Sequence, residues 1–271
     1  LQISSGYDGA GNVTSRSSTG GDFTQTLTWD AAGRMVKVAR RNSQNTGYDW
    51  KAVFDGLGRR LRTTHTPVTA GVPQAGTIQT DSVFDPQTEF LEISSGLNGQ
   101  RTSKVYGPDF DGTNGGLQGI GGLEATIRES DGLTSTAIND VFGNCVATAT
   151  SGVTTWNRTR VNSYGPLPGV PTDAWNGTLT LAAATNWRGL RLDETGFYNV
   201  GARPYDPLSG RFLAPDPLGH AASMSLYDLA NGDPVNEVDP TGRLGAPVNA
   251  NPNKLYGAIA VTTNPAIVTL Y

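Results

Sequence analysis

One short pattern recurs along this chain and limits what it can fold into: an aromatic residue, Asp, two variable residues and Gly. Clear copies begin at Tyr7, Trp29 and Phe54, 22 and then 25 residues apart, and a degenerate copy spans residues 139–144. The Asp carboxylate can accept backbone N–H bonds in a tight turn, and the Gly can take the positive φ of a bulged hairpin. Repetition at this period predicts one β-hairpin per unit, with the hairpins stacked into a continuous sheet.

The segments between the copies favour strands over helices. In the run 23–29 the alternate residues Phe23, Gln25, Leu27 and Trp29 fall on one face, as in a half-buried strand. Only 16% of residues are charged, which is low for exposed helix faces, and Thr, Ser, Asn, Val and Gly take their place. We therefore expect an all-β protein. Four aromatic side chains in and just after residues 150–186 are predicted packing anchors: Trp156, Tyr164, Trp175 and Trp187.

Charge, cysteine content and hydropathy argue against several classes. A net charge of −4 without a Lys/Arg cluster argues against a nucleic-acid partner. Cys145 is the only cysteine, so no disulfide can form within the chain. No stretch of 18 apolar residues is present to span a membrane. The first residues look like neither a start nor a signal peptide, so we expect them to lie inside a longer protein.

The most informative stretch covers residues 187–244. It contains, in order, Asp193-Glu194-Thr195-Gly196-Phe197-Tyr198, Ala202-Arg203-Pro204-Tyr205-Asp206-Pro207, Gly210-Arg211-Phe212-Leu213-Ala214-Pro215-Asp216-Pro217-Leu218-Gly219, Leu226-Tyr227, and Asn236-Glu237-Val238-Asp239-Pro240-Thr241-Gly242. This run closely resembles the RHS-repeat-associated core domain of bacterial RHS toxins and of the C component of Tc toxins. The aromatic-Asp units upstream resemble the YD repeats of the same family.

The resemblance implies a hollow shell. In that family the repeat hairpins wind as a spiralling β-sheet around a C-terminal toxic domain, and the core domain closes the shell and cuts the chain after its own end. We accordingly expect a YD-repeat shell segment at 1–186, the core at 187–244, and the start of a variable region at 245–271. The implied partners are the upstream repeats, the protein's own toxin cargo and a secretion or injection apparatus, in a secreted or surface-located bacterial protein.

Two aspartates are candidates for the cut. Asp216 and Asp239 each begin Asp-Pro-x-Gly and lie 23 positions apart. Pro fixes φ and Gly permits a sharp reversal, so each Asp sits at a rigid turn. Two carboxylates held close can share one proton; the charged one activates water and the protonated one polarises the scissile carbonyl. The spacing alone favours aspartates that only cap turns, and the resemblance shifts the interpretation to a cleavage dyad.

Arg203 matches the arginine of the family motif. It is expected either to orient a carboxylate with paired donors or to form an ion pair with any nearby Asp. The family usually has Leu after the second Asp-Pro-x-Gly, and the cut follows it, whereas here Arg243 holds that position and Leu244 follows. The expected scissile bond is Arg243–Leu244 or Leu244–Gly245, unless the change makes cleavage slow or absent.

The chain is thus at most an autoproteolytic aspartyl peptidase that acts on itself. No cofactor or metal is expected, and the two histidines, His65 and His220, lie too far apart in sequence to support a zinc site or a Ser-His-Asp triad. The alternative is a structural YD-repeat surface or adhesion protein whose core acts as a plug without cutting.

Overall fold

The computed structural model describes residues 2–109, 121–140, 142–167, 174–175, 177–221 and 224–243, with three short strands beyond them. Strands β1–β14 form one antiparallel sheet in chain order, with the short β7 paired only to β6. They are β1 (Ile3–Tyr7), β2 (Val13–Ser18), β3 (Thr24–Trp29), β4 (Met35–Arg41), β5 (Gly47–Phe54), β6 (Arg60–Thr69), β7 (Val72–Pro73), β8 (Ile78–Phe84), β9 (Glu92–Leu97), β10 (Gln100–Asp109), β11 (Gly121–Arg128), β12 (Thr134–Asn139), β13 (Cys145–Thr150) and β14 (Val153–Trp156).

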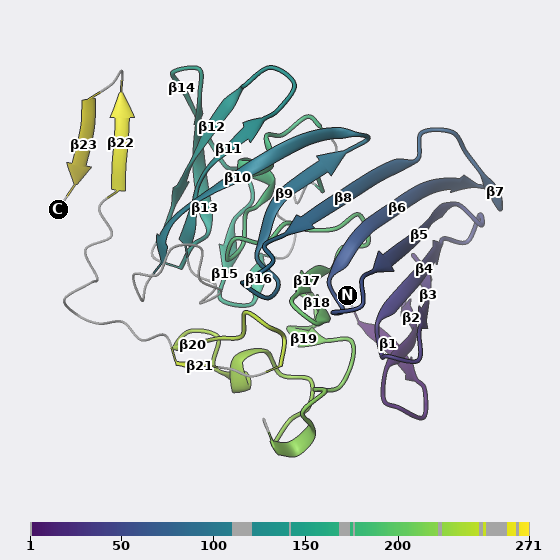
Figure 1. Ribbon diagram of the computed structural model, residues 1–271. Coiled ribbons are helices and arrows are strands. Elements are labelled where there is room, and N and C mark those ends of the chain that lie inside the picture. The colour runs from purple at the N-terminus through teal and green to yellow at the C-terminus, as the bar shows by residue number, and fades with distance from the viewer. Residues whose placement is uncertain are drawn as a thin grey trace.

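The rest of the chain forms small elements. They are β15 (Val161–Asn162), β16 (Gly165–Pro166), α1 (Leu181–Ala184), β17 (Tyr198–Val200), β18 (Arg203–Asp206), β19 (Arg211–Phe212), the 3-10 helices η1 (Gly219–Ala221) and η2 (Leu229–Gly232), β20 (Glu237–Val238), β21 (Ala246–Pro247), β22 (Ile259–Thr263) and β23 (Ala266–Leu270). The predicted all-β fold is confirmed. Figure 1 shows the sheet curving over the segment that carries β15–β20.

The aromatic-Asp units form the predicted hairpin turns. Tyr7, Trp29 and Phe54 each end a strand at a bulge in its pairing, so they occupy equivalent positions. The Asp30 turn shows the chemistry: Oδ1 accepts the N–H groups of Ala32 at 2.9 Å and of Arg34 at 3.0 Å. The carboxylate thus accepts hydrogen bonds from N–H groups of the turn that the pairing of the strands leaves without a partner.

Arginines link two of these turns to the turn that follows. Arg34 donates from Nε to Asp30 Oδ2 at 2.8 Å and from Nη1 to the carbonyl of Asp55 at 3.0 Å. Its guanidinium lies 5.0 Å from the ring centre of Phe54. Arg59 repeats the arrangement one unit on, with Nη1 3.1 Å from the carbonyl of Asp85. The Asp85 turn itself has no Asp-x-x-Gly pattern and was not predicted from the sequence.

The inner face of the sheet packs on residues that follow α1. Phe197 and Leu213 join one apolar cluster with sheet residues of the first three hairpins: Val13, Leu27, Met35, Val38, Tyr48 and Trp50. Charged pairs also cross this boundary, because Arg16 contacts Asp206 at 2.5 Å and Arg60 contacts Asp193 at 2.6 Å, all four side chains being buried. The predicted alternation at 23–29 is also confirmed, with Phe23, Gln25 and Leu27 buried and the threonines between them exposed.

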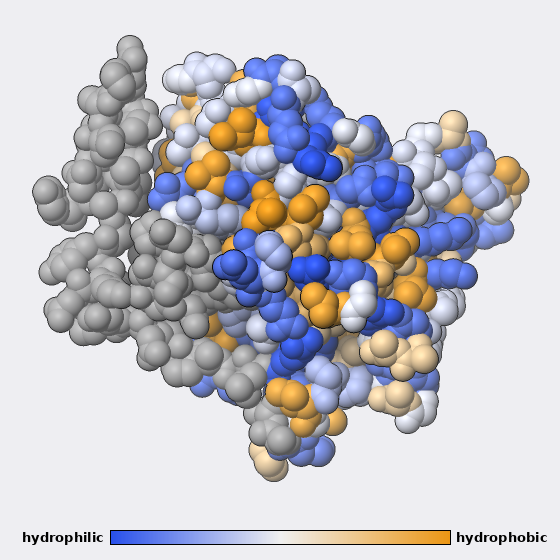
Figure 2. All heavy atoms as spheres, in the orientation of Figure 1, coloured by the Kyte–Doolittle hydropathy of each residue, from blue (hydrophilic) through white to orange (hydrophobic). Residues whose placement is uncertain are grey.

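Two of the predicted packing anchors are wrong. Trp175 and Trp187 are buried, but Trp156 is 71% exposed and Tyr164 40% exposed. Trp156 lies on β14, which ends the sheet and has a partner strand on one side only, so no neighbour covers it. On the face shown in Figure 2, apolar side chains gather about the middle, with hydrophilic ones spread around them. Within the described ranges, no helix is long and apolar enough to cross a membrane.

The turn geometry predicts unequal effects for two glycines of the repeats. Gly33 has φ +73°, whereas Gly56 lies outside the left-handed region, and an added Cβ would meet no atom within 4 Å at either position. Gly33→Ala should therefore lower the free energy of unfolding by about 1–2 kcal/mol through backbone strain alone. Gly56→Ala, the matched control, should leave it unchanged or raise it slightly. Equal losses in a denaturant titration would contradict this account of the turn.

Candidate active site

Arg203 is the centre of the candidate site. It begins β18, is only 3% exposed, and its guanidinium carbon lies 3.7 Å from the ring centre of Phe212. A buried guanidinium needs charge partners, since an isolated buried ion is too costly. Burial lowers the pKa of Arg203, while the carboxylates of Asp216 and Asp239 act in the opposite direction.

The structure brings all three predicted catalytic residues together. Nη2 of Arg203 lies 2.8 Å from Oδ2 of Asp216 and 3.3 Å from Oδ2 of Asp239. Both aspartates are buried. One nitrogen thus joins two carboxylates that are 23 positions apart in the chain.

Each aspartate also belongs to a turn of its own. Oδ1 of Asp216 accepts the N–H of Leu218 at 2.8 Å, and Oδ1 of Asp239 accepts the N–H of Arg243 at 3.0 Å. These bonds use one oxygen of each carboxylate and leave Oδ2 directed to Arg203. Turn capping by each aspartate and its ion pair with Arg203 are therefore compatible.

Arg203 also contacts the backbone just before the expected cut. Its Nε donates to the carbonyl of Gly242, and its Nη1 donates to the carbonyl of Leu226 at 3.0 Å. The Gly242–Arg243 peptide is thus held at its oxygen by Arg203 and at its nitrogen by Asp239. Of the predicted cleavage residues, Arg243 lies beside Asp239, and Leu244 and Gly245 lie outside the described residues.

Close backbone packing places this peptide. The N–H of Ala202 donates to the carbonyl of Thr241 at 2.9 Å. Gly201 and Gly242 have positive φ, and a Cβ on either would stand 2.2 Å from a backbone oxygen, of Thr241 and of Val200 respectively. The second Asp-Pro-x-Gly turn therefore docks directly on the turn between β17 and β18, where only glycine fits.

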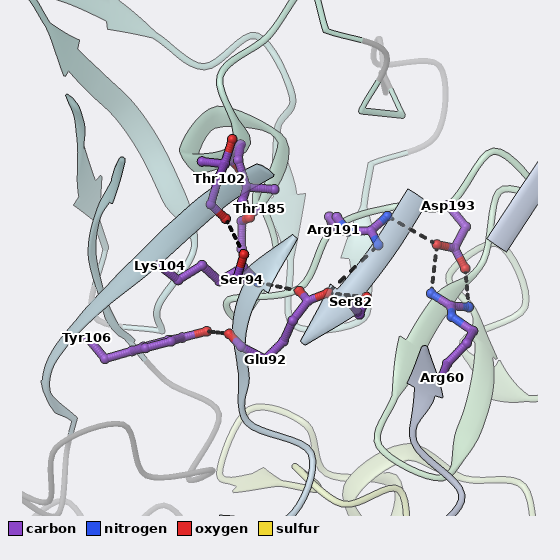
Figure 3. Close-up of polar contacts among 11 residues, drawn as sticks. Arg60, Ser82, Glu92, Ser94, Thr102, Lys104, Tyr106, Thr185, Arg191 and Asp193 are labelled. Atoms are coloured by element: carbon purple, nitrogen blue, oxygen red, sulfur yellow. Dashed lines mark hydrogen bonds and ion pairs between the residues drawn. The ribbon is translucent and has the colours of Figure 1, made fainter. Parts of the chain in front are cut away.

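A second, largely buried charged cluster was missed by sequence reasoning (Figure 3). Glu92 on β9 accepts from Lys104 Nζ at 2.6 Å and from the hydroxyl of Ser82, and Arg191 lies 3.9 Å away. Arg191 also lies 3.7 Å from Asp193. Its members come from β8, β9, β10 and the segment after α1, so no local sequence pattern marked the cluster.

A cavity of about 140 Å³ is lined by residues of both this cluster and the candidate site. Its walls include Glu92, Lys104 and Arg191 from the cluster and Asp239 with its neighbour Pro240 from the site. A cavity of this size with charged side chains in its wall can hold water. In the described part of the chain, no three His, Cys, Asp or Glu side chains gather as metal ligands.

The chain is similar to known proteins in parts. A family model described as RHS Repeat matches residues 7–44. Toxin subunit YenC2 of Yersinia entomophaga is 32% identical over 83 residues, which cover 30% of this chain and 9% of that protein. Salivary gland surface protein 1 of Aedes aegypti is 46% identical over 62 residues, 22% of this chain and 2% of that protein. The chain thus spans only a small fraction of the length of these relatives.

A solved structure has a similar fold over most of the chain. The crystal structure of TcdB2-TccC3-TEV matches with a TM-score of 0.61 and 20% identity, over 87% of this chain and 11% of that one. At this identity the similarity shows a common fold. The curved antiparallel sheet with its inward-packed C-terminal segment is therefore an arrangement that occurs in other proteins as well.

Glu92 should make stability depend on acid pH. Burial alone would raise its pKa, but Lys104 and Arg191 outweigh burial and lower the pKa from 4.5 to about 2. A depressed pKa stabilises the fold above pH 4.5, and this contribution is lost as the pH falls towards 2.

Glu92→Gln removes this carboxylate and leaves Lys104 without its buried partner. At neutral pH it should cost about 3–5 kcal/mol of unfolding free energy. The difference from wild type should shrink between pH 4.5 and pH 2, as followed by urea unfolding. A difference that stays constant over this window would show that Glu92 is not held as a buried ion.

Proposed function

Because this chain is an RHS/YD-repeat protein, we propose that it forms the C-terminal part of a toxin-enclosing β-shell and cuts its own polypeptide beside Asp239. The observation that carries the proposal is the position of Arg203. One buried guanidinium contacts Asp216, Asp239 and the carbonyl of Gly242.

The shell role follows from how the two parts pack. Residues 1–186 supply a curved wall, and residues 187–244 close it by packing against the inner face through the Phe197 cluster and the Arg60–Asp193 pair. Residues 245–271 then begin the enclosed cargo. The partners are the upstream repeats, the cargo and a secretion or injection apparatus, and the protein is secreted or located at a bacterial surface.

The proposed reaction is hydrolysis by a carboxylate pair. The ionised aspartate accepts a proton from water as the water oxygen attacks the scissile carbonyl carbon. The C–N bond then breaks, the protonated aspartate gives its proton to the leaving nitrogen, and a new carboxylic acid and a new amine result. The pair still holds one proton at the end, and Arg203 stabilises the negative charge that develops on the carbonyl oxygen.

The site favours a cut at one of three consecutive bonds. In the Gly242–Arg243 peptide, the oxygen accepts from Arg203 and the N–H donates to Asp239. The sequence pattern adds the bonds Arg243–Leu244 and Leu244–Gly245. The cavity that borders Asp239 would supply the attacking water.

A second candidate function is a structural surface protein that does not cut. Two observations favour it: Asp216 and Asp239 accept turn N–H groups as the repeat aspartates do, and one relative is named a surface protein. In that case the Arg203 cluster would only fasten the core to its own turns.

Intact-mass spectrometry of the purified chain separates the two. Wild type should give two fragments whose masses identify one of the three bonds. Asp216→Asn and Asp239→Asn keep the turn bonds but cannot share a proton, so the cut should be at least about 100-fold slower. Arg203→Ala should block it, and Asp30→Asn, a matched change in a repeat turn, should leave it unaffected. If the wild-type chain stays intact, self-cleavage is excluded and only the structural role remains.

A further inference from the structure

The Asp239 turn has the same residue spacing as the repeat turns, but the side chain of its arginine has a different partner. In the repeats, the arginine four residues after the Asp binds that Asp twice. The N–H of Arg59 donates to Oδ1 of Asp55 at 2.9 Å, and its Nε donates to Oδ2 at 2.7 Å. Arg34 does the same to Asp30.

Residues 239–243 read Asp-Pro-Thr-Gly-Arg, which is the same pattern. The first bond is present, since the N–H of Arg243 donates to Oδ1 of Asp239 at 3.0 Å. The guanidinium, however, is directed to Glu89, with Nη1 at 2.9 and 3.2 Å from its two oxygens. Oδ2 of Asp239 is contacted by Arg203 where a repeat Asp would bind its own arginine.

The turn that receives Arg243 has an unusual backbone. Glu89 and Phe90 lie between β8 and β9, in the turn opened by Asp85. Phe90 has φ +63°, in the region that glycine occupies in the other turns. A bulky residue rarely adopts this conformation, and such strain tends to persist where function needs it. Here it places the ring 5.3 Å from the guanidinium carbon of Arg243.

We propose that Glu89 and Phe90 hold the Arg243 side chain away from Asp239 and so reserve Asp239 for Arg203 and the dyad. Without this holder, the guanidinium of Arg243 is within reach of Oδ2, because the backbone bond already matches that of Arg34 and Arg59. Two guanidiniums on one carboxylate would keep it ionised, and the pair could no longer share a proton. This role of Glu89 as a positioning residue rests on the proposed self-cleavage.

Cleavage rates in the full 271-residue chain test whether Glu89 and Phe90 hold Arg243 away from Asp239. Glu89→Gln should slow the cut at least 10-fold, because Arg243 then folds back onto Asp239. Adding Arg243→Leu to Glu89→Gln should restore the cut, since no guanidinium remains to compete. Loss of a merely structural ion pair would not be rescued in this way.

The matched control is Asp131→Asn. It removes an ion pair with Arg128 that is about as exposed as Glu89–Arg243, and the rate should stay at the wild-type value. A wild-type rate in Glu89→Gln would overturn the proposal while leaving self-cleavage intact.

A second measurement works even if no cut occurs. In an Asp216→Asn chain labelled with ¹³C at the aspartate carboxyl carbons, the Asp239 signal is assigned by its loss in Asp239→Asn and titrated by NMR. Adding Glu89→Gln should lower the pKa of Asp239, because the guanidinium of Arg243 then joins that of Arg203 beside the carboxylate. An unchanged titration would overturn the holder whatever the wild-type chain does. Uncut wild type together with a lowered pKa would overturn self-cleavage alone.

Discussion

The bond between an aspartate carboxylate and the backbone N–H groups of its own turn is the interaction on which this structure depends. In the repeats it closes each hairpin, and the arginine that follows ties one turn to the next. The same bond fixes Asp216 and Asp239 in the second half of the chain. The wall and the candidate site are therefore built from one local motif, and what differs is the partner of the second carboxylate oxygen.

Buried charge determines how the C-terminal segment sits in the wall. Arg16–Asp206, Arg60–Asp193 and Glu92–Arg191 are specific pairs in a boundary that apolar contacts alone would leave free to slide. A buried charge costs more free energy without a partner than with one. A displaced C-terminal segment would therefore leave several buried charges unpaired at once. This fixed position is what allows Arg203 to meet the second Asp-Pro-x-Gly turn from 36 residues away.

Sequence reasoning predicted the features that local chemistry encodes. The aromatic-Asp units predicted the hairpins and their bulges, and the motif resemblance pointed to Arg203, Asp216 and Asp239, which the structure places in contact; their catalytic role stays a prediction. The Asp85 turn escaped notice because Phe90, not glycine, takes the positive φ. Trp156 was misjudged because nothing local reveals that β14 is an edge. The partners of Glu92 and Arg243 lie across the fold, so no spacing rule could identify them.

The central claim is that Asp216 and Asp239 act as one pair that shares a proton. The most direct test is the rate of self-cleavage as a function of pH, in single-turnover measurements on freshly folded protein. One ionised and one protonated carboxyl group are both required, so the account predicts a bell-shaped profile whose two apparent pKa values belong to the pair. A rate that rises or falls through a single titration and then stays constant would contradict it, because only one of the two aspartates would then take part.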